Sequence, residues 1–224
     1  MKVNLIIRSA RRLASTIAFI AFWGGMLAPE GYAAGVWTNE PTGANVVLDC
    51  PFNTVSGCGI FDVYSSSVAD SDGSAPISPS GVVRSTIYSG NLSGGMQLGY
   101  TTPQMNREMY VGFMWRTNPQ FYGRPQHDKM FFVRGPQTNG YFGMYTCPGC
   151  ANRQLGWSHN HAAYDESHTC GDSGYWCFAN VGSPQITIGQ WTKIEVYMKS
   201  STTMTSRDGI LRWWINGSPA GNYT

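Results

Sequence analysis

The chain has 224 residues, of which 42% are apolar and 13% aromatic, while only 12% are charged. A formal net charge of +2 excludes a strong overall field of either sign, and with it the electrostatic attraction on which most nucleic-acid-binding proteins rely. The length is sufficient for one domain with a substantial core.

The first 33 residues are predicted to be a secretory signal peptide. An apolar run over 13–28 and the small-x-small cleavage site Gly31-Tyr32-Ala33 follow a basic start that contains Lys2, Arg8, Arg11 and Arg12. Cleavage before Ala34 leaves 11 basic and 12 acidic side chains, a net charge of −1. The remaining domain, residues 34–224, is expected to be a secreted or periplasmic monomer that binds neither nucleic acid nor, once the leader is removed, a membrane. An uncleaved N-terminal anchor is the alternative interpretation.

Six cysteines in an exported chain predict disulfides. Cys50 and Cys58 enclose a loop rich in turn-forming residues and are expected to pair with each other. The pairing of the other four stays open between local and cross-linked bridges; these are Cys147, Cys150, Cys170 and Cys177. A four-thiolate zinc site is the alternative for them, which an oxidising compartment disfavours.

Short apolar runs between turn signals predict an all-β fold in one domain. No convincing amphipathic helix is found in the sequence. In chain order, we expect strands over 45–48, 81–89, 96–100, 108–116, 129–134, 140–146, 154–159, 185–188, 191–199 and 210–215. The Ser, Asp, Pro and Gly-rich stretch 65–80 is expected to be a loop.

The expected strand 108–116 separates into two faces, because successive strand side chains point to opposite sides of a sheet. One face is apolar and is assigned to the core; it consists of Met109, Val111, Phe113 and Trp115. The other face carries Glu108, Tyr110 and Arg116, with Gly112 leaving room for a ligand to approach. Such a face is suited to binding sugar.

The clearest pattern lies over 191–221. Apolar and polar residues alternate along its first arm, in which Glu195 is on the polar side, and Asp208-Gly209 and Asn216-Gly217 supply turns. A Trp that opens a strand, a DG turn and then LRWWINGSPAG resembles the late strands of the concanavalin A-like jelly rolls, nearest to secreted polysaccharide lyases and their uncharacterised relatives. The likeness covers the last third of the chain, is weaker over 106–145 and is absent before that.

The resemblance implies an antiparallel β-sandwich of the jelly-roll type, with a glycan groove on one sheet. Members of this group add at least one strand after the corresponding NG turn. A chain that stops at Thr224 is therefore compatible with a missing last strand or strands, and with a fragment of a longer protein.

The resemblance also implies a lyase that cleaves uronate-containing glycan by β-elimination. That reaction needs a base, an acid and a group that neutralises the uronate carboxylate. His127 is the candidate base, and Tyr110 or Tyr145 is the candidate acid. The neutralising group is expected among Arg84, Arg116 and Lys129, and Glu108 completes the predicted catalytic set. If strand 108–116 neighbours the strand that begins at His127, these catalytic residues converge on one sugar ring.

Further residues are predicted to bind substrate. Several jelly-roll lyases carry a Gln-x-His motif, whereas Gln126 and His127 are adjacent here and would point to opposite faces. Trp157 is expected to stack on a sugar ring. His159 and His161 have the spacing of a metal-binding pair on a strand, but a disulfide-tethered loop beside the groove is the preferred interpretation. No catalytic metal or cofactor is expected, and calcium is the structural ion that this fold type accommodates.

Two other functions remain open. The same polar and aromatic residues would serve a non-catalytic carbohydrate-binding module. A retaining glycoside hydrolase is the second alternative, with Glu108 and Glu195 as its two carboxylates, about 5 Å apart.

Overall fold

A computed structural model describes residues 2–9, 37–50, 52, 54, 58–62, 67–76, 81–86, 98–102, 106–121, 127–134, 139–145, 152–159, 176–203, 205–206 and 208–224. Among them, no helix is long and apolar enough to cross a membrane.

The regular elements among the described residues are all strands. They are β1 (Lys2–Ser9), β2 (Asn45–Cys50), β3 (Phe61–Asp62), β4 (Ser67–Asp70), β5 (Val82–Ser85), β6 (Leu98–Gly99), β7 (Glu108–Arg116), β8 (His127–Arg134), β9 (Asn139–Tyr145), β10 (Asn152–His159), β11 (Trp176–Cys177), β12 (Ile186–Thr187), β13 (Thr192–Lys199), β14 (Ile210–Ile215) and β15 (Ser218–Tyr223). The expected all-β class is confirmed. Within the stretch 65–80, expected to be a loop, the structure instead has strand β4.

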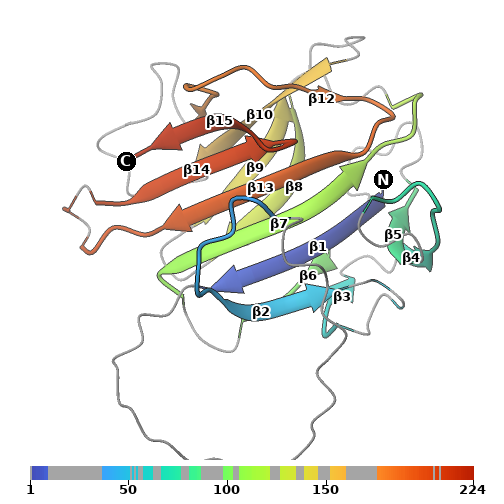
Figure 1. Ribbon diagram of the computed structural model, residues 1–224, viewed down its shortest axis with the longest axis horizontal. Coiled ribbons are helices and arrows are strands. Elements are labelled where there is room, and N and C mark those ends of the chain that lie inside the picture. Colours follow the sequence, from blue (N-terminus) through green and yellow to red (C-terminus); the bar gives the residue numbers. More distant parts are fainter. Residues whose placement is uncertain are drawn as a thin grey trace, which may run out of the picture.

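Two large antiparallel sheets and a two-stranded one, β3-β6, build the described part of the molecule (Figure 1). The larger one has eight strands in the order β15-β14-β13-β7-β1-β5-β4, with β2 paired to β1. The second has five, in the order β11-β10-β9-β8 with β12 paired to β10, and Figure 1 shows β8–β10 lying behind β7 and β13. This arrangement is consistent with a β-sandwich.

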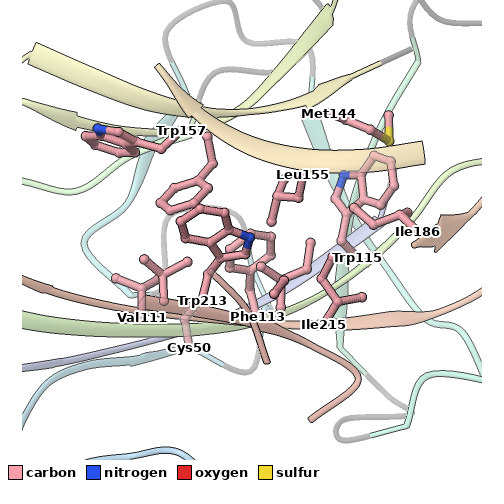
Figure 2. Packing of buried hydrophobic residues seen from close by; sticks show 14 of the residues in the cluster. Cys50, Val111, Phe113, Trp115, Met144, Leu155, Trp157, Ile186, Trp213 and Ile215 are labelled. Carbon is pink, nitrogen blue, oxygen red and sulfur yellow. The ribbon is translucent and has the colours of Figure 1, made fainter. Parts of the chain in front are cut away.

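The core lies between the two sheets, where side chains from both meet (Figure 2). Trp213 of β14 is fully buried, and its ring centroid lies 5.5 Å from that of Phe142 on β9. Phe142 in turn lies 4.9 Å from Trp157 on β10, and Phe113 of β7 lies 6.1 Å from Phe131 on β8. Burying such rings contributes about 1.5–3 kcal/mol per side chain, so these contacts join the two sheets.

The alternation predicted for β7 is confirmed. Val111, Phe113 and Trp115 belong to the core, and Met109 packs against it. Along β13 the apolar positions face the core in the same way. The outer face of the large sheet is therefore lined by the polar positions of the same strands.

Of the two turns expected in the C-terminal part, the one at Asn216-Gly217 is confirmed, whereas Asp208-Gly209 lies at the end of a longer connection, because β13 ends at Lys199 and β14 begins at Ile210. Asn216 and Gly217 both have positive φ, 51° and 80°, which is the requirement of the tight turn that joins β14 to β15. Strand β15 follows that turn directly, whereas the sequence pattern alone ended at Ile215.

Strand β15 lies at one end of the large sheet, and a short segment satisfies its outer edge. The backbone N–H of Asn180 donates to Ala220 O, and its side-chain amide donates to Asn222 O at 2.9 Å. The N–H of Asn222 donates back to Asn180 Oδ1 at 2.8 Å. Asn180 thus imitates a neighbouring strand over two residues.

Cys50 and Cys58 form the expected disulfide. Cys177 on β11 is also disulfide-bonded, and no described cysteine is free. Cys147, Cys150 and Cys170 lie outside the described residues.

Strand β1 falls inside the predicted signal peptide. Its backbone pairs antiparallel with β7 from Lys2 to Arg8, and on its other side with β2 and β5. Residues 2–9 therefore lie inside the large sheet, between β7 on one side and both β2 and β5 on the other.

Candidate functional site

The predicted catalytic residues fall on two different sheets. Strand β7, with Glu108, Tyr110 and Arg116, belongs to the eight-stranded sheet, and β8, with His127 and Lys129, belongs to the five-stranded one. The condition for their convergence, that these two strands are neighbours, is not met. Because the core face of β7 is directed at the second sheet, its polar face is directed away from β8, and the five residues do not converge.

On the outer face of the large sheet, the charged side chain of Glu195 is completely buried. Tyr110 donates its hydroxyl to Glu195 Oε1 at 2.7 Å, and the backbone N–H of Asn39 donates to the same oxygen at 3.0 Å. The amide of Asn39 donates to Oε2 at 3.1 Å, and the ammonium of Lys193 lies 3.4 Å from Oε2.

The segment 37–40 covers this network. Gly112 provides the space: a Cβ on it would lie 2.5 Å from Cε3 of the Trp37 ring, closer than real contacts allow. The gap that the sequence suggested for a ligand at Gly112 is thus filled by Trp37. Tyr110 is 1% exposed and its hydroxyl is already donated, so it does not have the access that a catalytic acid needs.

A second charged residue of this sheet, Arg116, is paired as well. Arg116 pairs with Asp72, donates to Ser74 Oγ at 2.9 Å and lies 5.0 Å from the ring centroid of Trp191. These contacts hold the loop that follows β4 against the sheet.

Two weaker ion pairs lie farther along the same sheet. Arg84 pairs with Asp70 at 2.9 Å, and Glu108 lies 3.9 Å from Lys199. Burial, together with the charge of Glu108, raises the pKa of Tyr197. The face as described is a set of internally satisfied contacts.

The outer face of the five-stranded sheet is different. The register of β8, β9 and β10 puts His127 opposite Tyr145, and Tyr145 opposite Gln154. Met144 and Leu155, which are next to Tyr145 and Gln154 in the chain, are buried in the core. Because successive side chains point to opposite faces, this row occupies the outer face. Directly opposed strand residues have Cβ atoms about 5 Å apart. The candidate base and the candidate acid Tyr145 thus occupy adjacent positions.

The next row on this face contains Lys129, Gly143 and Gly156. Lys129 and the nearby Gln154 are exposed, while the two glycines carry no side chain. A row beyond them contains Phe132, Tyr141, Ser158 and Trp176. The ammonium of Lys129 lies 5.7 Å from the ring centroid of Phe132. Titratable, cationic and aromatic residue types therefore occupy successive rows.

Four other residues predicted to bind substrate lie outside this row. Trp157 is 3% exposed and packs in the core, so a sugar-stacking role does not fit its position. His159 follows it by two residues, on the same side of β10. Gln126 and His161 lie outside the described residues. Gln154 and Tyr141 were missed, although each lies one residue from an apolar position of a strand that the sequence predicted.

The two carboxylates of the hydrolase alternative do not meet. Glu195 is in register with Gly112, and Glu108 is in register with Lys199. Gly112 lies four positions after Glu108, which is about 13 Å along a strand at ~3.3 Å per residue. Retaining hydrolysis needs about 5–5.5 Å between the two carboxyl groups.

Among the described residues, no cluster of His, Cys, Asp and Glu is arranged to hold a metal ion. No known protein family, curated protein or solved structure matches the chain.

Proposed function

We propose that the chain is an exported lyase of the concanavalin A-like jelly-roll type, which cleaves a uronate-containing polysaccharide by β-elimination. The observation that supports this most directly is the row of His127, Tyr145 and Gln154, with Lys129 in the next row. Of the acids and cations that the sequence offered, Tyr145 and Lys129 share a sheet with His127, whereas Tyr110, Arg84 and Arg116 do not.

In this proposal each residue has a separate task. His127 removes the C5 proton of the uronate, and the electron pair forms the C4–C5 double bond as the C4–O bond breaks. Tyr145 donates its proton to the departing glycosidic oxygen. Lys129 neutralises the carboxylate, which makes the C5 proton acidic enough to be removed, and Gln154 assists by hydrogen bonding.

The test is the appearance of ultraviolet absorbance from the unsaturated product, measured on alginate, glucuronan, pectate and glycosaminoglycans. We expect His127→Ala to lower turnover about 10²–10⁴-fold, the usual contribution of a general base. Asp128→Asn is the matched control, because Asp128 is the next residue of β8 and belongs to the opposite face. Reducing ends released without new absorbance would instead indicate a hydrolase.

A non-catalytic glycan-binding module is the second candidate. The row with Phe132, Tyr141 and Trp176 favours it, since aromatic rings stack on the apolar faces of sugars. Glycan binding by the wild-type protein without either product signal would support this function and exclude the lyase.

A further inference from the structure

The large sheet is continuous only because residues 2–9 are in it. In the described part of the chain, β1 is the strand that connects β7 with β2 and β5. Without β1, the edge of β7 that faces it loses its partner over the seven positions from Arg116 to Tyr110. We refer to the space between β7 and the pair β2/β5 as the β1 slot.

The chemistry of the β1 slot is defined by its walls. Three alternate positions of β1 lie in register with buried core residues: Val3 with Trp115, Leu5 with Phe113, and Ile7 with Val111. On the other wall, the partners of Leu5 and Ile7 are Cys50 and Leu48, which are also in the core. The slot therefore requires an extended strand, antiparallel to β7, with an apolar residue at every second position.

Export separates β1 from this slot. The apolar run 13–28 lies between β1 and the rest of the domain. In an exported protein the basic start of a leader stays on the cytoplasmic side, while the domain that follows crosses the membrane. Residues 2–9 and β7 then lie on opposite sides of the membrane, whether or not the leader is cut.

We infer that the β1 slot of the exported domain is a strand-binding site, which takes an extended segment of another polypeptide with alternating apolar residues. This inference rests on the export proposed above, but not on the lyase chemistry. Strand addition gains main-chain hydrogen bonds along β7, and the core positions select the apolar side chains. Residues 2–9 show what the slot accepts, because they fill it in the uncleaved chain.

The experiment measures binding of a fluorescent peptide with the sequence of residues 2–9, followed by fluorescence anisotropy. Three forms of the protein are compared: the uncleaved chain refolded oxidatively, its Leu5→Asp variant, and the protein that an exporting host releases. Position 5 is in register with the core residues Phe113 and Cys50, so a charged residue there is expected to weaken the pairing of the chain's own strand. We expect the variant and the exported protein to bind the peptide at least about tenfold more tightly than the uncleaved chain.

The controls separate strand insertion from other effects. Asn4→Asp in the uncleaved chain is the matched variant, since Asn4 pairs with Met114 on the outer face, and it should bind no better than wild type. A peptide carrying Asp in place of Leu5 should bind poorly to every form. If the Leu5→Asp variant does not fold, peptide binding by the exported protein is compared with that by the uncleaved chain instead.

Equal binding by the exported protein and the uncleaved chain would overturn the inference, as would equal binding of the two peptides. If the exported protein binds the peptide but lacks lyase activity, the proposed function is refuted and the inference that the β1 slot binds a strand still stands.

Discussion

The two outer faces of this molecule carry similar residue types and differ in what those residues contact. On the large sheet, Tyr110, Glu195 and Lys193 form a closed network beneath Trp37 and Asn39. On the five-stranded sheet, Lys129 and Gln154 are exposed beside the positions of His127 and Tyr145. A tyrosine and charged residues on a strand are thus no sign of a site by themselves. What distinguishes the two faces is that Tyr110 and Glu195 are buried, whereas Lys129 and Gln154 are exposed.

The largest expected effect comes from replacing one tyrosine of each outer face, Tyr145 and Tyr110, with phenylalanine. Tyr145→Phe should lower turnover about 10²–10⁴-fold and leave the melting temperature almost unchanged, because it removes only the hydroxyl that is the proposed proton donor. Tyr110→Phe should lower the melting temperature with little effect on turnover, because it removes a buried hydrogen bond to Glu195. Assays of turnover and thermal unfolding on both variants check this. If Tyr110→Phe lost activity but kept the stability of the wild type, the large sheet and not the five-stranded sheet would carry the catalytic tyrosine.

Glu195→Ala should cost about 3 kcal/mol of unfolding free energy, the scale of a buried ion pair that loses one partner. The substitution leaves the Tyr110 hydroxyl and the Asn39 amide without their acceptor and Lys193 without its carboxylate. Denaturant unfolding measures the loss. Lys199→Ala is the control, since its ion pair with Glu108 is long and only partly buried, and it should cost less than about 1 kcal/mol.

Gly112→Ala should cost about 1–3 kcal/mol, the usual range for overpacking, because the new methyl group collides with the Trp37 ring. In the Trp37→Ala background the same substitution should cost much less. The double-mutant cycle therefore reports whether Trp37 really closes this face. Additive effects of the two substitutions would mean that it does not.

The smallest effect concerns pH. Hydrogen bonds from Thr202, first from its side chain, hold the pKa of Asp208 well below its ordinary value of 3.8. A carboxyl group whose pKa is lowered by folding contributes stability above the unfolded pKa, and that contribution disappears as the pH falls through the folded pKa. Asp208→Asn should therefore be slightly less stable than wild type at pH 7. The difference in stability between the two proteins should become smaller below about pH 4. Melting temperatures across this range test it.

The sequence was sufficient for the faces of individual strands but not for their neighbours. Alternation along β7 predicts its core face correctly, because a period of two reports which side of a sheet a residue occupies. It carries no information on which strand lies alongside. Convergence of the predicted catalytic residues required β7 and β8 to be neighbours, and they lie in two different sheets. The pairing of His127 with Tyr145 is a property of register, which the sequence pattern did not reveal.

The burial of Trp157 was within reach of the sequence. It shares one side of β10 with Leu155, and two apolar residues at that spacing indicate a core face. By contrast, the complete burial of Glu195 depends on a segment 156 positions away along the chain, Asn39, and strand periodicity gives no sign of such a contact.

The edge of β15 has a consequence for how the molecule behaves in crowded solution. A free sheet edge offers a row of unpaired N–H and C=O groups, on which another copy of the same strand can dock and start ordered aggregation. Asn180 occupies those groups at Ala220 and Asn222 with its backbone and its side-chain amide. Asn180 is therefore expected to hinder the pairing of another strand with this edge of the large sheet.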